Sequence, residues 1–264
     1  MKYPIALFLI IFVDHLALGQ ILKVDKASLD ADSSGYFMGN INMDFNLNNR
    51  GATAEEQITF RGLTANADVV YVSEKHAYVL INTINYFKST GGPLISTGYA
   101  HFRINLWRRK KMSYETFSQV QYDDGRNMPF RFLQGAGLRL NLKNGKKTNF
   151  HIGIGAMFEH EKWRALDEEN AVLERNIWKT SNYLGGQFKI NDFVRFNVIC
   201  YYQGGYDRDS DIFRNRVSGD VVLRVKLTEK LAFLNSFTLQ YEDRPIIPIN
   251  NFLYSLTNGL QWNF

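Results

Sequence analysis

Apolar and polar residues alternate along most of the chain. One stretch places Ile41, Met43, Phe45 and Leu47 on one side of an extended backbone and Asn40, Asn42, Asp44, Asn46 and Asn48 on the other. The pattern recurs over residues 99–106, 150–158 and 217–227. Side chains of a strand point to opposite faces in turn, so each stretch predicts a strand with one apolar and one polar face. Stretches of about 10 to 15 residues are long for a globular strand and suit a tilted strand that crosses a bilayer.

Twelve such strands, within a range of ten to fourteen, are expected. They lie near residues 34–48, 54–73, 76–88, 97–108, 112–124, 129–142, 148–163, 176–190, 193–207, 212–227, 231–243 and 252–264. Connectors such as "SEKH", "RRKK" and "TEK" are short, and those between them, such as "KSTGGPLIST" and "EDRPIIPIN", are mostly longer. Outer-membrane barrels have short periplasmic turns, longer outer loops and an even number of strands. The expected fold is therefore all-β: a closed antiparallel transmembrane β-barrel with both chain ends on the periplasmic side.

Three short turns predict the register of their hairpins, because paired residues of an antiparallel hairpin point to the same face. A two-residue turn at Asn144-Gly145 would place Arg139 opposite Phe150, so we expect a three-residue loop centred on Gly145. That loop pairs Arg139 with His151, Gly137 with Gly153, Gly135 with Gly155 and Arg131 with Glu159. Turns centred on Asn191 and Glu229 pair Phe188 with Val194, Val225 with Phe233, Val221 with Phe237 and Arg216 with Glu242.

The chain ends on an alternating strand that carries Trp262 and Phe264. In a closed barrel this strand must pair with the first one, because unpaired backbone groups are strongly disfavoured in lipid. Its aromatic end also resembles the C-terminal signature by which outer-membrane barrels are recognised by their assembly machinery. Trp262 and Phe264 are therefore the expected assembly signal.

The beginning of the chain has the features of an export signal. Lys2 precedes an apolar run over residues 5–13, and Ala17-Leu18-Gly19 places small residues where a signal peptidase reads them. A membrane-anchoring helix would need about 18 or more apolar residues, roughly twice this run. We expect cleavage before Gln20. The expected organisation is a signal peptide over 1–19, a polar periplasmic segment over 20–33 and an outer-membrane barrel over 34–264.

Composition and charge remove several other classes of protein. The chain has one cysteine, Cys200, so an internal disulfide framework is excluded. The net charge of +5 comes from scattered basic residues without the single stripe that a nucleic-acid-binding protein shows, so no nucleic acid is expected. The expected partners are outer-membrane lipid, lipopolysaccharide and the barrel-assembly machinery, and the oligomeric state stays open. No cofactor is expected.

The middle of the chain resembles a known family. Residues 114–142, "YETFSQVQYDDGRNMPFRFLQGAGLRLNL", and 152–163, "IGIGAMFEHEKW", are similar to the salt-induced outer-membrane proteins, known as domain of unknown function 481. The resemblance is strongest over about residues 100–165, and elsewhere only the strand pattern is similar. It implies an outer-membrane location and a barrel fold, and it brings no established chemistry or catalytic residues.

The polar faces of the predicted strands point into the barrel. Ten charged residues are expected there and could line a pore: Arg103, Glu115, Arg131, Arg139, Glu159, Arg195, Arg216, Asp220, Arg224 and Glu242. Positive charge slightly exceeds negative charge, which predicts a narrow, often occluded pore with a weak preference for anions. Gly135, Gly137, Gly153 and Gly155 form a patch without side chains, which lets bulky groups from across the lumen approach the wall or lets the strands bend. A purely structural barrel is the other non-catalytic interpretation.

A surface hydrolase, either a protease or a lipase with its site at the extracellular rim, is the alternative function. The His-x-Ser motif of outer-membrane phospholipases is absent, because His101 precedes Phe102-Arg103 and His151 precedes Ile152-Gly153. Acidic residues and His160 lie near the predicted rim: Asp123, Asp124, Asp207, Asp209, Asp211, Glu159 and Glu161. Such rims are more often solvated or cation-bridging surfaces than catalytic sites. No catalytic residue is assigned, and no metal site is expected, since no ligand spacing recurs. The charged stretch 164–176 is expected to be an exposed outer cap, with a short helical turn as a second interpretation.

Overall fold

The protein folds into one antiparallel β-sheet. The computed structural model describes residues 35–51, 57–145, 147–166 and 171–262. The strands are β1 (Tyr36–Gly51), β2 (Gln57–Val72), β3 (Ala77–Ser89), β4 (Gly92–Leu106), β5 (Met112–Asp123), β6 (Met128–Asn144), β7 (Thr148–Arg164), β8 (Val172–Thr180), β9 (Asn182–Lys189), β10 (Val194–Asp207), β11 (Ile212–Lys226), β12 (Leu231–Glu242) and β13 (Phe252–Trp262). A short 3₁₀ helix, η1 (Asp124–Arg126), connects β5 to β6. Within the described residues, no helix is long and apolar enough to cross a membrane.

Each strand pairs with its neighbours in sequence, and β8 and β9 share one position in the sheet. Both of these short strands pair with β7 on one side and β10 on the other. The strand conformation is interrupted between them at Ser181. The sheet therefore has the expected twelve positions, and the all-β antiparallel fold is confirmed. The connections β2–β3, β4–β5, β6–β7, β9–β10 and β11–β12 lie at one end of the sheet, called here the turn end. The other connections lie at the loop end.

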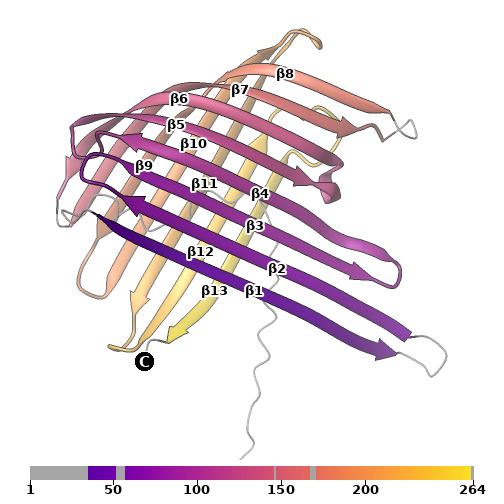
Figure 1. Ribbon diagram of the computed structural model, residues 1–264, viewed down its shortest axis with the longest axis horizontal. Helices are drawn as coiled ribbons and strands as arrows, with labels where there is room; N and C mark the ends of the chain where they lie inside the picture. Colours follow the sequence, from indigo (N-terminus) through magenta and orange to yellow (C-terminus); the bar gives the residue numbers. More distant parts are fainter. Residues whose placement is uncertain (1–34, 52–56, 146, 167–170, 263–264) are drawn as a thin grey trace, which may run out of the picture.

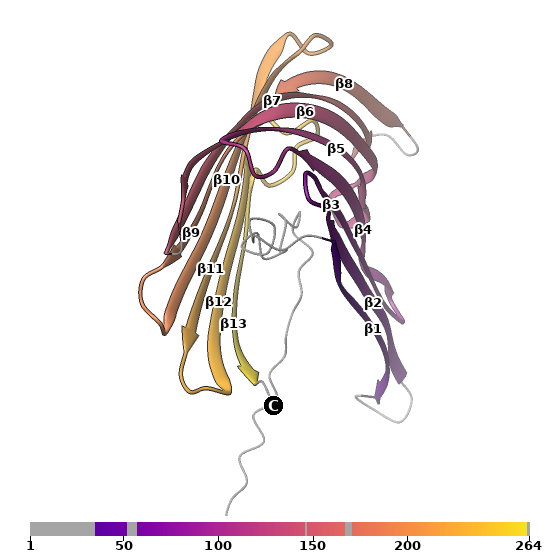
Figure 2. The same ribbon diagram turned by 60° about the vertical axis from the view of Figure 1, so that its left-hand side comes forward.

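The sheet curls so that its two halves face each other (Figures 1 and 2). Strands β1–β5 form one wall, β9–β13 form the opposite wall, and β6–β8 arch between them. The expected pairing of the first and last strands differs from the structure. In the described part of the chain β1 pairs with β2 and β13 with β12, and these edge strands lie apart in Figure 2. Within the described residues, the sheet therefore keeps β1 and β13 as two edge strands.

One of the three predicted registers is confirmed and two are wrong by two residues. Strands β11 and β12 pair as predicted, with Arg216 opposite Glu242 and Val225 opposite Phe233. In β6 and β7, Arg131 lies opposite Glu161, Arg139 opposite Gly153, Gly137 opposite Gly155 and Gly135 opposite Met157. In β9 and β10, Phe188 lies opposite Phe196. A shift of two residues keeps every side chain on its predicted face, because strand side chains alternate with a period of two.

A β-bulge and wider turns cause these two shifts. Strand β6 is irregular at Leu142, since Asn141 pairs with His151 while Lys143 pairs with Phe150. The last pair before this turn is Asn144 with Asn149, so the loop is longer than the predicted three residues. A bulge inserts one residue in one strand and changes all pairs beyond it.

Three predicted boundaries also change. Residues 88–97 are not a long loop, because β3 and β4 continue to a tight turn at 90–91. The expected single strand over 176–190 is divided into β8 and β9. The helical turn within 164–176 is wrong for residues 172–176, which belong to β8 and extend the β7–β8 hairpin. A register of cross-strand pairs continues along that extension, with Lys162 opposite Glu174.

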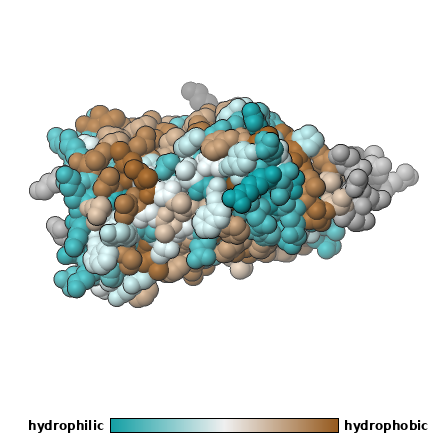
Figure 3. Space-filling model, turned by 90° about the horizontal axis from the view of Figure 1, so that it is seen from above, coloured by the Kyte–Doolittle hydropathy of each residue, from teal (hydrophilic) through white to brown (hydrophobic). Residues whose placement is uncertain are grey.

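The distribution of side chains is the reverse of a water-soluble core. Among the described residues, buried polar and charged side chains outnumber buried apolar ones. Large apolar side chains are exposed on the outer face, as with Ile41 at 75% and Trp178 at 71%. Seen from above, brown apolar atoms cover much of this outer surface, interrupted by hydrophilic patches (Figure 3). Charged residues are almost never fully buried unless they are paired, so the interior must hold paired charges.

Candidate functional site

A network of ion pairs occupies the loop end of the interior. This loop-side network consists of Arg126, Arg131, Glu159, Glu161, Lys179, Arg216 and Glu242. Glu159 has no exposed surface, and it contacts Arg131, Arg216 and Lys179. The Arg131 Nε donates a hydrogen bond to Glu159 Oε1 at 2.7 Å and lies 3.2 Å from Glu161 Oε1. Except for Arg126, which comes from η1, these side chains share the interior because each occupies an inward position of an alternating strand.

Arg216 joins the wall formed by β9–β13 to the arch formed by β6–β8 through this network. It belongs to β11 and bonds across the interior to β7, with Nη1 2.7 Å from Glu159 Oε1 and Nη2 3.0 Å from Glu161 Oε1. Its Nε also bonds to Glu242 on the neighbouring strand β12. Glu242 in turn accepts a hydrogen bond of 3.3 Å from Arg126 of η1. The network therefore connects β6–β8 to β11 and β12 and fills the space between them.

A second group of charged and aromatic residues lies nearer the turn end. This turn-side cluster consists of Arg103, Glu115, Arg139, Tyr183 and Tyr201. Tyr183 Oη donates a hydrogen bond of 2.5 Å to Glu115 Oε2, and Arg103 Nη2 donates one of 3.4 Å to Tyr201 Oη. Both bonds cross the interior, from β4 and β5 to β9 and β10. One carboxylate serves two guanidinium groups here, at 4.0 Å from Arg103 and 3.9 Å from Arg139.

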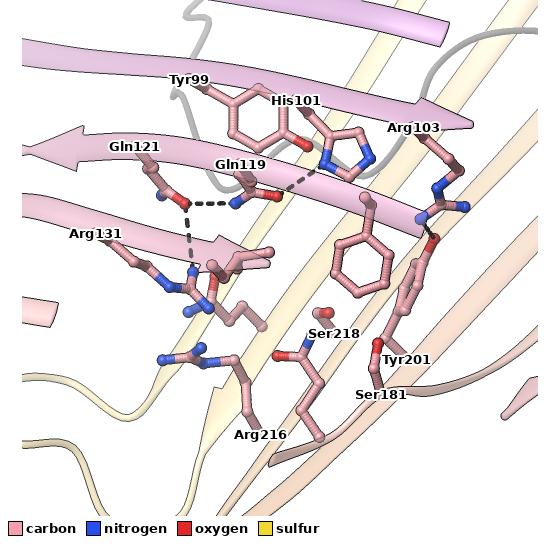
Figure 4. A pocket seen from close by; sticks show the side chains of 14 residues that line it. Tyr99, His101, Arg103, Gln119, Gln121, Arg131, Ser181, Tyr201, Arg216 and Ser218 are labelled. Carbon is pink, nitrogen blue, oxygen red and sulfur yellow. Dashed lines mark hydrogen bonds between the residues drawn. The ribbon is translucent and has the colours of Figure 1, made fainter. Parts of the chain in front are cut away.

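A cavity of about 90 Å³ lies between the two groups (Figure 4). Its lining comprises three arginines, four glutamines, two serines, four rings and one leucine: Arg103, Arg131, Arg216, Gln119, Gln121, Gln203, Gln240, Ser181, Ser218, Tyr99, His101, Phe117, Tyr201 and Leu133. No aspartate or glutamate is among these residues. A chain of hydrogen bonds follows one wall, from His101 Nδ1 to Gln119 at 3.1 Å, from Gln119 to Gln121 at 3.2 Å and from Arg131 to Gln121 at 3.3 Å. Among the described residues, the lining combines polar side chains and rings, and its charged members are arginines.

The β12–β13 loop, residues 243–251, folds over the loop end of the interior. Ile247 is buried against Trp163 and Met128, and Ile246 and Ile249 pack on the same cluster. Polar contacts hold the loop to β11: the Asn215 backbone N–H donates to Asp243 at 2.7 Å, and the Arg214 guanidinium donates to the backbone carbonyl of Arg244. Apolar packing and hydrogen bonds together keep this loop over the mouth of the interior.

The structure brings most of the predicted interior residues together. Eight of them are buried: Arg103, Glu115, Arg131, Arg139, Glu159, Arg216, Asp220 and Glu242. Arg195 and Arg224 are register partners near the turn end of β10 and β11, and Arg195 is exposed there. Trp262 is the last residue of β13, and Phe264 lies outside the described residues.

Sequence reasoning missed several members of the two groups. Glu161 and Lys179 occupy inward positions with the same parity as predicted interior residues, so alternation alone could have found them. Tyr183 and Tyr201 also have inward parity, but an aromatic side chain on a polar face suggests no charge network. Arg126 comes from η1, where alternation gives no information.

The predicted glycine patch accommodates rings and close backbone contacts. A side chain at Gly153 would meet the Tyr183 ring at 1.9 Å, and one at Gly185 would meet the His151 ring at 2.2 Å. A side chain at Gly137 would lie 2.7 Å from the Ile154 carbonyl oxygen. Bulky groups do approach this part of the wall, and Tyr183 comes from the paired strand β9 and not from across the interior.

Several acidic residues of the expected rim are engaged by arginine or lie in the buried network, whereas Asp211 accepts a hydrogen bond from the Tyr206 hydroxyl. Arg214 Nε donates to Asp207 Oδ2 at 2.8 Å, and Arg164 Nη1 donates to Asp124 Oδ1 at 2.9 Å. The His160 ring contacts Asn176 at 2.8 Å, next to the exposed hairpin extension. Among the described residues, no group of three histidine, cysteine, aspartate or glutamate side chains could hold a metal ion.

Two solved structures are similar to this chain at low sequence identity. The NanC porin, solved in a rhombohedral crystal form, is 12% identical with a TM-score of 0.45, covering 77% of this chain and 94% of that chain. The CymD monoaromatic hydrocarbon channel is 10% identical with a TM-score of 0.42, covering 91% of this chain and 83% of that chain. No protein-family model and no curated protein matches the chain. The resemblance to the salt-induced outer-membrane proteins therefore stays a prediction.

Proposed function

We propose that the protein is a non-catalytic outer-membrane β-barrel whose lumen is a narrow, weakly anion-preferring pore. One observation carries this proposal: apolar side chains cover the outer face of the sheet while paired charges fill its interior. In water, so much exposed apolar surface would be a liability, whereas lipid solvates it. The strands suit such a crossing, since a tilted strand needs about 9–11 residues and β6 and β7 have 17 each.

The contacts across the interior support a narrow lumen. Arg216 joins β11 to β7, and Tyr183 joins β9 to Glu115 of β5, so side chains meet in the middle of the barrel at two levels. The loop over residues 243–251 adds a third constriction at the loop end. Anion preference follows from the cavity between the levels, because its lining carries arginine and no carboxylate.

Closure belongs to the same proposal. In a bilayer, the outer backbone edges of β1 and β13 would face lipid with unpaired N–H and C=O groups. Pairing between these two strands removes both edges, so we expect the wall to close when the chain enters a membrane.

Two measurements on the refolded protein in lipid test this function. In vesicles, lipid-soluble quenchers should reach fluorescent probes attached at Ile154 and Leu256 and should not reach a probe at Ser218. In planar bilayers, single channels should be small and should pass chloride more readily than potassium. Equal quenching at all three positions contradicts the membrane orientation. A silent bilayer, together with the expected quenching, would instead show a structural barrel without a pore.

A further inference from the structure

We infer that the cavity between the loop-side network and the turn-side cluster binds a small oxyanion, and that Arg103 recognises it. The inference rests on the proposed lumen and names the class of solute that the lumen holds. The ligand chemistry is a carboxylate or phosphate group on a small polar molecule. Three arginines and no carboxylate face the cavity, so its walls favour a negatively charged occupant.

The three arginines differ in how far their charge is already compensated. Arg131 and Arg216 each bond to two or more carboxylates of the loop-side network at close range. These guanidinium groups are therefore committed to Glu159, Glu161 and Glu242. At the cavity, these two side chains form part of the lining.

Among the described residues, Arg103 is the lining arginine that still has a buried hydrogen-bond donor without a partner. Its side chain is 8% exposed, and its buried Nε has no hydrogen-bond partner within the described structure. The nearest carboxylate is Glu115, whose Oε2 lies 4.0 Å from Arg103 and accepts a hydrogen bond from Tyr183, while its Oε1 lies 3.9 Å from Arg139. A buried donor without a partner destabilises the protein, and a guanidinium group bonds best to a planar or tetrahedral oxyanion through two parallel N–H groups. An oxyanion beside Arg103 would satisfy both requirements.

Neutral groups around Arg103 limit the size and kind of the occupant. The amides of Gln119 and Gln203 and the hydroxyl of Ser181 can donate to further oxygens of the anion or accept from a hydroxyl group beside it. The rings of Tyr99 and Phe117 also line the cavity and supply an apolar boundary. A volume of about 90 Å³ has room for one oxyanion group and a few more atoms. The site therefore suits compact, singly or doubly charged solutes.

Thermal unfolding of the full chain in detergent micelles tests this site directly. We would compare sodium acetate, sodium phosphate and glycerol with sodium chloride at matched ionic strength, and follow unfolding by circular dichroism. A ligand that binds only the folded state raises the midpoint temperature. Acetate, phosphate or both should raise it by several degrees, and the difference between these two arms identifies the preferred group. Glycerol, which is neutral, should leave it unchanged.

Variants assign the effect to Arg103. Arg103→Gln should abolish the anion-dependent shift, and Arg103→Lys should retain only part of it because lysine lacks the fork geometry. Arg195→Gln is the matched control, since it removes an exposed arginine outside the cavity, and its shift should equal that of the wild type. If Arg103→Gln does not refold, Ser218→Phe fills the cavity from the opposite wall without removing a charge and should also abolish the shift.

Two results overturn the inference: no shift with either oxyanion in the wild type, or an equal shift in Arg103→Gln. These failures are distinct from a failure of the proposed pore. If the currents prefer anions but neither oxyanion raises the midpoint temperature, the proposed pore is supported and the proposed binding site is contradicted. If the midpoint temperature rises in a way that depends on Arg103 but the protein passes no current in bilayers, the binding site is supported and the barrel is plugged.

Discussion

At the scale of single residues, Glu159 is central to the interior because three cations depend on it. It is fully buried and contacts Arg131, Arg216 and Lys179. Glu159→Gln keeps the shape and removes the charge, which leaves buried cations uncompensated. Breaking a buried ion pair in this way costs about 3–5 kcal/mol. We expect a marked fall in the urea midpoint of the refolded barrel.

The exposed pair between Lys162 and Glu174 provides the control for that experiment. These side chains form an ion pair of 2.7 Å on the extension of the β7–β8 hairpin. Exposed pairs contribute little because water screens them. Glu174→Gln should therefore leave the urea midpoint unchanged, and an equal fall in both variants would show that the loop-side network is not what stabilises the fold.

Gly153 is a second residue with a specific requirement. A methyl group there would overlap the Tyr183 ring, which lies 1.9 Å from its position. Gly153→Ala should displace Tyr183 from Glu115 and destabilise the barrel by about 1–3 kcal/mol, as overpacking does. Gly259→Ala is the control, because nothing lies within 4 Å of its added methyl group. Equal heat-unfolding midpoints for the two variants would contradict the close approach of Tyr183.

At the scale of elements, the β6–β7 hairpin tests the register. The structure pairs Leu138 with Ile154, and both side chains point outward and are exposed. In a Cys200→Ser background, cysteines at positions 138 and 154 should form a disulfide under mild oxidation. Cysteines at positions 138 and 152, which the register predicted from the turn would pair, should not. Preferential crosslinking of positions 138 and 152 would instead support the register without a bulge that the turn predicted.

The β12–β13 loop is the element most suited to control access to the interior. Ile247 is 2% exposed and anchors the loop on Trp163 and Met128. Ile247→Asp places a charge in this apolar cluster and should release the loop, which would increase single-channel conductance in planar bilayers. Ile190→Asp, at an exposed position of the β9–β10 turn, should leave the conductance unchanged. An unaltered current in Ile247→Asp would indicate that the loop-side network, and not the β12–β13 loop, forms the narrowest part of the lumen.

At the scale of the whole molecule, alternation predicted which face each strand presents far better than which residues meet. Arg131 and Glu161 lie on the interior face as their parity requires, yet their pairing depends on the bulge at Leu142 and on the width of the following turn. The alternation of apolar and polar residues does not show where such local irregularities occur. Contacts across the interior, such as Arg216 with Glu159, depend on how strongly the sheet curls, which hydrophobic patterning does not encode. The cavity could not be predicted for the same reason.

The loop-side network also has a consequence for the order in which the protein assembles. Arg126 and Glu242 are separated by 116 residues, and Arg216 and Glu159 by 57. Contacts of such long sequence separation form late, because the closing of long loops loses much chain entropy. Until the last hairpin arrives, Arg126 and Arg216 lack Glu242, so an incomplete wall encloses uncompensated charge. A chain that stops after Lys230 should therefore stay sensitive to protease under conditions in which the full chain resists it. The wall therefore becomes stable only after β12 and β13 have joined the sheet, because only then are the buried charges compensated.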